Sequence, residues 1–122
     1  MGTTKNMEAM NNMVELTEDN FEMEVIQAAV PVVVDFYAPW CGPCKMLAPL
    51  LEQFAGDFAG RLKFAKANVD HAPDLAGRYG VTGVPTLILF RGGETLDRVV
   101  GFPGPRQLKA WLDKAANAAV TA

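Results

Sequence analysis

The sequence is poor in cysteine and histidine, and it has no excess of positive charge. Of its 122 residues only two are cysteine and one is histidine. Lysine and arginine total 11 against 14 aspartate and glutamate, which gives a net charge of −3. No run of basic residues offers the positive stripe that phosphate backbones need, so nucleic acid is not an expected ligand.

Long hydrophobic runs are also missing. The longest apolar stretches are strand-sized and are interrupted by Asp35 or by glycine, so no membrane-spanning helix is expected. The first thirteen residues, MGTTKNMEAMNNM, carry one lysine and no continuous apolar stretch of seven residues. This segment does not resemble a secretory signal, and we therefore expect a cytoplasmic protein.

The composition suits one folded domain. Half of the residues are apolar and a fifth are charged, and a chain of this length can bury most of its apolar surface without cross-links. Residues 1–13 are rich in Asn and Met without a clear period. We interpret them as a flexible N-terminal extension, with a partner-binding amphipathic helix as the alternative, and residues 14–122 as a single domain.

Strand and helix patterns alternate along that domain. VELT is a short strand, and Thr17 is expected to cap the helix that follows it. VVVDFY (32–37) is an apolar, β-branched run typical of a strand buried on both faces. From Cys41 to Phe58 the apolar residues recur at helical spacing, with Pro49 expected to kink the helix.

The second half of the chain continues the alternation and then changes. LKFAKANV reads as a strand, 73–79 as a short helix that starts at its proline, and 108–119 as a closing helix. TLILF and ETLDRVV flank Gly92 and Gly93, which indicates a hairpin. The order βαβαβαββα predicts an α/β domain with a mixed five-stranded sheet and four helices, parallel through the crossovers and antiparallel at the end.

Both cysteines lie in WCGPCK, residues 40–45. A zinc half-site would need further ligands, and the chain offers only His71, which is expected at the surface, so a second subunit would have to close it. A structural disulfide would close a minimal loop and gain little from cross-linking. Reversible dithiol chemistry is the reading that these residues favour.

The helix start provides a mechanism for that chemistry. If Cys41 is the N-cap, its sulfur faces the free N–H groups of the first turn, and Cys44 supplies the donor because Pro43 has none. A pKa lowered by one to two units needs about 1.4–2.7 kcal/mol, which a helix terminus (~2 kcal/mol) and one charge-assisted hydrogen bond (~1.5–3 kcal/mol) can supply. Cys41 would attack a target disulfide and Cys44 would resolve the mixed disulfide. Because Gly42 adds no charge, a reductant is favoured.

WCGPCK, preceded by VVVDFYAP and followed by a helix with Pro49, resembles the thioredoxin family, and the resemblance extends from about Val14 to Ala115. It implies a thioredoxin fold and a general protein disulfide reductase, active as a monomer with no cofactor or metal besides its Cys41–Cys44 disulfide. In this resemblance Cys41 matches the nucleophile and Cys44 the resolving cysteine.

The resemblance also assigns roles around the thiols. Asp35 matches a buried aspartate of the central strand, Lys66 its neighbour, and Pro85 a cis-proline that faces the thiols. Taken alone, Asp35 would more often lie at an edge turned to water. Burial would instead raise its pKa towards neutrality and let it accept the proton of Cys44. The positions that match the docking patch and substrate groove are Trp40, Gly42, Pro43, Gly83, Val84, Gly93 and Gly101, and Tyr37 stands where many members carry tryptophan.

Partners follow from the same resemblance. An NADPH-dependent thioredoxin reductase would supply electrons, and targets would include ribonucleotide reductase, peroxiredoxin and methionine sulfoxide reductase. No nucleic acid and no membrane is expected. Two alternatives stay open at this point: a protein disulfide oxidase or isomerase on the same fold, and a binding module that uses the groove without redox chemistry.

Overall fold

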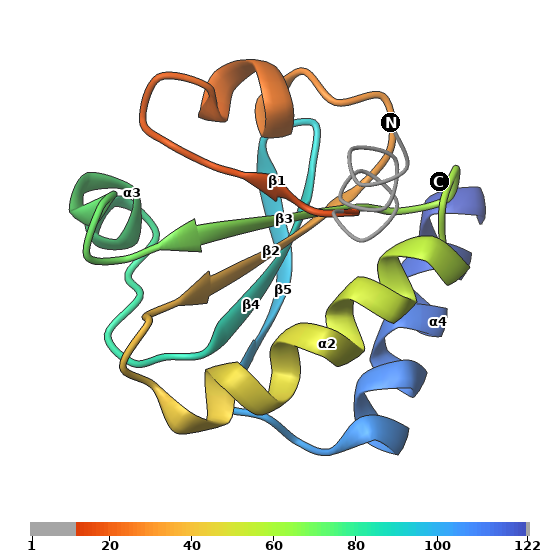
Figure 1. Cartoon of the computed structure of the whole chain (residues 1–122). Helices are drawn as coiled ribbons and strands as arrows, with labels where there is room; N and C mark the ends of the chain where they lie inside the picture. Colours follow the sequence, from red (N-terminus) through yellow and green to blue (C-terminus); the bar gives the residue numbers. More distant parts are fainter. Residues whose placement is uncertain (1–11, 122) are drawn as a thin grey trace, which may run out of the picture.

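The computed structural model describes residues 12–121, with side chains through Asn117. It has five strands and four helical segments in the predicted order (Figure 1). The strands are β1 (Val14–Glu15), β2 (Val32–Tyr37), β3 (Lys63–Asn68), β4 (Thr86–Arg91) and β5 (Glu94–Val100). The helices are η1 (Glu22–Ile26), α2 (Gly42–Asp57), α3 (Pro73–Arg78) and α4 (Pro105–Thr121). Residues 1–11 of the predicted extension lie outside the described residues.

The strands form one mixed sheet in the order β1-β3-β2-β4-β5. β3 runs parallel to β1 and β2, whereas β4 is antiparallel to β2 and to β5. The expectation of parallel strands at every crossover was therefore wrong for the connection through α3. A helix of six residues spans only about 9 Å, which is too short to return the chain along a strand of about 20 Å. β4 consequently starts at the end of the sheet at which β3 finishes, and it runs in the opposite direction.

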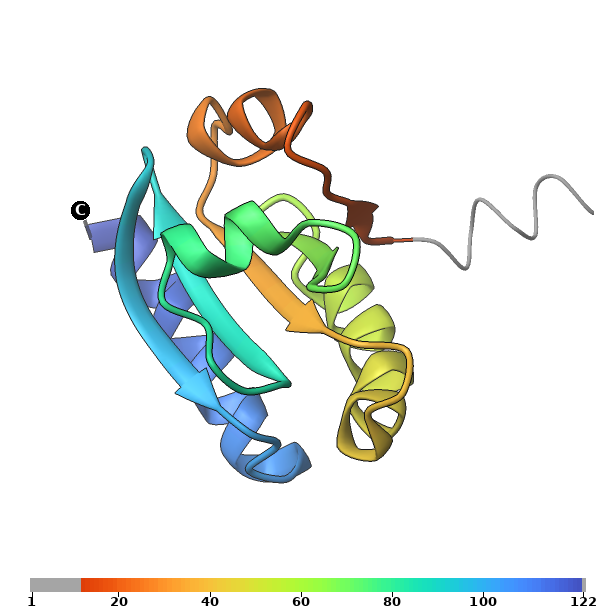
Figure 2. The same ribbon diagram turned by 90° about the vertical axis from the view of Figure 1, so that its left-hand side faces the viewer.

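The sheet lies between two helical layers (Figures 1 and 2), with α2 and α4 on one face and η1 and α3 on the other. β2 is the central strand of the sheet and contributes side chains to the hydrophobic core on each face. Val33 packs with α2 and α4, while Val34 and Phe36 pack on the opposite side. Burial on both faces explains why VVVDFY lacks the alternation of an exposed strand.

The first helical segment differs from the prediction. Thr17 Oγ1 accepts the backbone N–H groups of Asp19 and Asn20, each at 3.2 Å, and so closes a turn instead of capping a helix. Asn20 adds to this turn by accepting the Thr17 N–H at 2.7 Å. The helical segment begins only at Glu22, as a single π-helical stretch without a side-chain cap. Local side-chain bonds have replaced the expected first turn.

Several other local predictions are confirmed, while the kink expected at Pro49 stays a prediction. α2 continues through Pro49 to Asp57, α3 starts at Pro73, and Gly92 and Gly93 form the hairpin turn with φ of 57° and 89°. The packed domain starts before Val14, because Met13 is 4% exposed and belongs to the core under α2 and α4.

Candidate active site

Cys41 and Cys44 form a disulfide across the first turn of α2, with their Cα atoms 5.3 Å apart. Cys41 is the N-cap residue, in extended conformation, and its Sγ accepts the backbone N–H of Cys44 at 3.2 Å. Both residues are buried, with exposed fractions of 5% and 4%. The predicted cap geometry is confirmed, so a thiolate at Cys41 would keep a donor aimed at it.

A second segment faces the disulfide. The Val84–Pro85 peptide bond is cis, and the Val84 carbonyl oxygen lies 3.7 Å from Cys41 Sγ. Thr86 Oγ1 donates to the Gly83 carbonyl at 2.6 Å, and the Gly101 N–H donates to the Pro85 carbonyl at 2.8 Å. These bonds hold Gly83, Val84 and Gly101 around Pro85, so the structure brings together residues that are far apart in the sequence.

Trp40 forms an exposed apolar rim beside Cys41. Its side chain is 69% exposed, and its indole N–H donates to Asp70 Oδ2 at 3.0 Å. Gly42 and Pro43 are exposed on the same turn. Trp40, Gly83 and Val84 line a hollow of about 190 Å³ together with Val69, Val81 and Thr82. Sequence reasoning missed Asp70 and these three lining residues, because they lie in a strand end and loops without a motif.

Asp35 lies two residues after Val33 in β2, so its side chain points to the same face of the sheet, the one that α2 covers. It is 4% exposed, and burial raises its pKa from 3.8 to about 7 against the lowering effect of the Lys66 charge. Its Oδ1 has no hydrogen-bond donor among the described residues. The expectation of a buried carboxyl group is confirmed, and the alternative of an edge position turned to water is wrong.

Two further expectations concern residues away from the thiols. Gly93 was expected in the substrate groove, but it follows Arg91 at the end of β4, whereas Pro85 precedes the start of that strand. A Cβ atom at Gly93 would lie 3.3 Å from Ile26 Cγ2. Its role is therefore in the hairpin and its packing on η1. His71 is exposed, and its Nδ1 lies 3.4 Å from Asn68 Nδ2.

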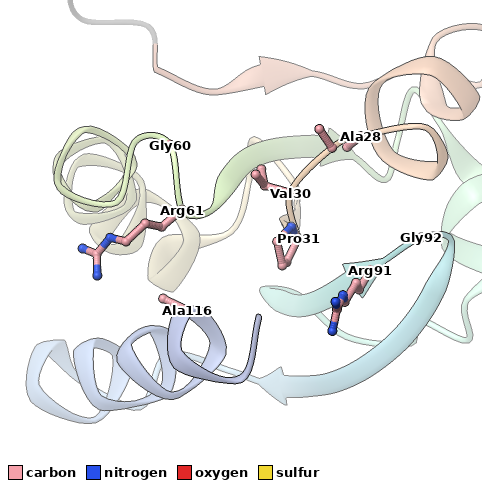
Figure 3. A pocket seen from close by; sticks show the side chains of 9 residues that line it. Ala28, Val30, Pro31, Gly60, Arg61, Arg91, Gly92 and Ala116 are labelled. Carbon is pink, nitrogen blue, oxygen red and sulfur yellow. The ribbon is translucent and has the colours of Figure 1, made fainter. Parts of the chain in front are cut away.

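A larger cavity lies at the hairpin end of the sheet, away from the thiols (Figure 3). Its volume is about 400 Å³, and Arg61 and Arg91 are the only charged residues among the described ones that line it. The other lining residues are apolar or glycine. No nucleophile and no acid–base pair from the described part of the chain faces this cavity, so the disulfide region is the candidate active site.

Residues 12–121 contain no group of three or more His, Cys, Asp or Glu side chains placed to hold a metal ion. In the same range, no helix combines the length and the apolar character needed to cross a bilayer.

The site combines a disulfide at a helix N-terminus, the Val84 backbone beside it and a buried carboxyl group in the central strand. These are the features of a thiol–disulfide oxidoreductase. Comparison with known proteins agrees with this class. The profile of the Thioredoxin family matches residues 12–114, and the chain belongs to that family. It is a protein disulfide reductase that works by dithiol–disulfide exchange.

Several curated relatives cover most of the chain. A "Thioredoxin" of Allochromatium vinosum is 50% identical over 103 residues, which are 84% of this chain and 96% of the relative. "Thioredoxin 1" of Nostoc sp. is 42% identical over 105 residues, 86% of this chain and 98% of the relative. A "Thioredoxin" of Pseudomonas aeruginosa is 46% identical over 102 residues, 84% and 94% of the two chains.

Proposed function

We propose that Cys41 is the attacking thiol and Cys44 the resolving thiol of this reductase. The Cys41 thiolate attacks one sulfur of a target disulfide, a Cys41–target bond forms, and the other target sulfur leaves as a thiolate that takes up a proton. Cys44 then loses its proton and attacks Cys41 Sγ. The mixed disulfide breaks, the Cys41–Cys44 bond forms, and two electrons have passed to the target. The N-cap position of Cys41 and its 3.2 Å bond from the Cys44 N–H support this order.

Asp35 is the proton acceptor of the resolving step. A base works best when its pKa lies near the working pH, and burial raises the pKa of Asp35 to about 7. The ionised carboxylate takes the Cys44 proton, either directly or through a bridging water molecule. Lys66, whose register partner in β2 is Asp35, contributes the positive charge that keeps part of the carboxyl population ionised at neutral pH.

Target segments bind over the thiols in extended form. The Val84 backbone beside Cys41 supports this proposal, because an extended chain can pair with a free main-chain N–H and C=O. Trp40, Gly42 and Pro43 supply exposed surface on one side, and the exposed Gly83 and the half-buried Gly101 lie on the other. The three glycines among these positions keep the patch flat enough for varied partners.

The redox cycle needs an electron donor and acceptors. We expect an NADPH-dependent thioredoxin reductase to reduce the Cys41–Cys44 disulfide, and ribonucleotide reductase, peroxiredoxin and methionine sulfoxide reductase to be targets. The protein acts as a monomer in the cytoplasm, where a reducing glutathione pool favours the dithiol form. It uses no metal or cofactor, since both electrons are held by its two thiols.

Serine variants test the two cysteine roles. Cys44→Ser retains the attacking thiol and should accumulate a mixed disulfide with a protein target, seen as a dithiothreitol-sensitive adduct by mass spectrometry. Cys41→Ser should form no such adduct and should reduce insulin no faster than buffer with dithiothreitol. An adduct that forms through Cys44 in Cys41→Ser would reverse the proposed roles. Biological activity in the double serine variant would instead indicate a redox-independent binding module.

A further inference from the structure

Lys66 and Glu15 extend the row that contains Asp35 to the edge of the sheet. Glu15 in β1 is opposite Lys66 in β3, and Lys66 is opposite Asp35 in β2, so the three side chains point to the same face. Tyr37 lies two residues after Asp35 and points to that face as well. β1, β3 and β2 are adjacent in Figure 1, with β1 at the edge.

The three outer side chains are in contact. The Tyr37 hydroxyl donates to the Glu15 carboxylate, 3.0 Å from one oxygen and 3.1 Å from the other. Lys66 Nζ lies 3.9 Å from Glu15 Oε1 and 5.9 Å from the centre of the Tyr37 ring. Among the described residues no ion pair joins Lys66 to Asp35, and Glu15 is the acid that Lys66 contacts.

We infer that Glu15, held in place by Tyr37, is a positioning residue that directs the Lys66 ammonium group away from Asp35 and so sets how strongly Lys66 acts on the buried carboxyl group. The consequence for catalysis rests on the proposed role of Asp35 as proton acceptor. Glu15 itself touches neither the thiols nor the substrate patch. Its effect passes through Lys66 and through its own charge.

The charges around Asp35 fix the direction of this effect. Lys66 lowers the pKa of Asp35 and Glu15 raises it, both against the larger effect of burial. Removing the Glu15 charge would end its direct repulsion and would free Lys66 to turn towards Asp35. Both changes stabilise the ionised carboxylate, so the pKa of Asp35 falls when Glu15 becomes neutral.

Tyr37 gives the arrangement a fixed geometry over the working pH range. Burial, together with the Glu15 hydrogen bond, raises the pKa of Tyr37 to about 12. The hydroxyl therefore remains a donor at any pH at which the enzyme works. An aliphatic or phenyl side chain at position 37 would leave the exposed Glu15 carboxylate free to move into solvent.

The other elements packed on Asp35 supply no competing charge from the part of the chain that the structure describes. β4 and β5 continue the row with Leu87 and Val99. The buried residues of α2 and α4 on this face are apolar apart from Cys44. The titratable groups that face Asp35 are thus Lys66, Glu15, Tyr37 and, in the reduced protein, the two thiols. Lys66 and Glu15 are 36% and 47% exposed, and an ion pair this exposed adds little to folding stability.

The test is a pH titration of the Asp35 carboxyl carbon by NMR in the oxidised protein, where the thiols do not titrate. The signal is assigned by its loss in Asp35→Asn. Glu15→Gln should shift the titration midpoint to lower pH, and Tyr37→Phe should shift it the same way by less. Lys66→Gln should shift the midpoint to higher pH. Adding Glu15→Gln to Lys66→Gln should produce a smaller shift than Glu15→Gln alone, because the part carried by Lys66 is gone.

Glu24→Gln is the matched control. Glu24 in η1 pairs with Lys63 at 2.6 Å. Lys63 lies in β3, as Lys66 does, but its side chain points to the opposite face of the sheet. The variant therefore removes the same charge and an ion pair without touching Asp35. An unchanged midpoint in Glu15→Gln, or an equal shift in Glu24→Gln, would overturn the inference. The pH dependence of insulin reduction by Glu15→Gln should move with the NMR midpoint. If the NMR midpoint moves and the rate profile does not, the positioning role stands and the base role of Asp35 fails.

Discussion

Asp35 is an ionisable group in a buried position, where the charged form loses its hydration. Ionisation of Asp35 should therefore lower the free energy of unfolding of the protein. Burial raises the pKa of Asp35 in the folded protein to about 7, whereas the ordinary pKa of an aspartate is 3.8. Between these values the unfolded chain binds fewer protons than the folded protein, so the free energy of unfolding falls as pH rises. About three pH units at about 1.4 kcal/mol each set the loss at up to about 4 kcal/mol.

Asp35→Asn should therefore be more stable than the parent protein at pH 8 and about equally stable at pH 4. Asparagine has nearly the same shape but never ionises, so it avoids the loss. Urea unfolding of both oxidised proteins at several pH values measures the difference. Asp57→Asn, at an exposed position at the end of α2, serves as the control and should follow the parent curve. A difference between Asp35→Asn and the parent that is independent of pH would contradict the buried charge.

The β4–β5 hairpin offers a test of backbone geometry within one turn. Gly92 and Gly93 both have positive φ, but a Cβ atom would meet a neighbour only at Gly93, where Ile26 Cγ2 would lie 3.3 Å away. Alanine at either site should cost about 1–2 kcal/mol for the left-handed backbone. Gly93→Ala should cost more than Gly92→Ala, because the new methyl group must also displace Ile26.

Chemical denaturation of the two alanine variants gives the comparison, and insulin reduction gives the control. Both variants should retain the parent rate at a temperature where they are folded, because the turn and the thiols lie at opposite ends of β4. Equal destabilisation of the two variants would mean that packing on Ile26 contributes nothing. A selective loss of activity in Gly93→Ala would restore the expected role of Gly93 in the substrate groove.

Elements with a strong local signal could be predicted from the sequence. The β-branched run 32–37, the helical spacing after Cys41 and the glycine pair of the hairpin each specify their structure through steric preferences of a few residues. The first helix could not be placed, because Thr17 and Asn20 have two ways to satisfy the same backbone groups and the turn was the one adopted. The direction of β4 depended on the length of α3 and not on a pattern in β4.

The candidate site shows the same division. The cysteine pair and its helix cap are adjacent in sequence, so local geometry sufficed to predict them. The burial of Asp35 and the approach of Val84 to Cys41 needed either the family resemblance or the fold. Glu15 and Tyr37 could not be recognised, because their contact joins β1 to β2 across β3 and depends on strand register.

The first described residues of the domain, Asn12 and Met13, contact the helical layer that carries the thiols. Met13 packs in the core formed by α2, α4 and one face of the sheet. The backbone N–H of Asn12 donates to Glu52 Oε1 at 2.9 Å, and its side chain donates to the Glu52 carbonyl at 3.3 Å. These contacts predict that the folded unit includes Asn12 and Met13.

A chain starting at Asn12 should unfold at the same urea concentration as the full chain and reduce insulin at the same rate. Met13→Ala should lose about 2–5 kcal/mol, the usual cost of truncating a buried methionine in a packed core. Met23→Ala is the matched control, because Met23 is 68% exposed and should change stability by less than about 0.5 kcal/mol. Destabilisation of the truncated chain would contradict Asn12 as the start of the folded unit. An unaffected stability in Met13→Ala would mean that the core under α2 and α4 does not depend on the Met13 side chain.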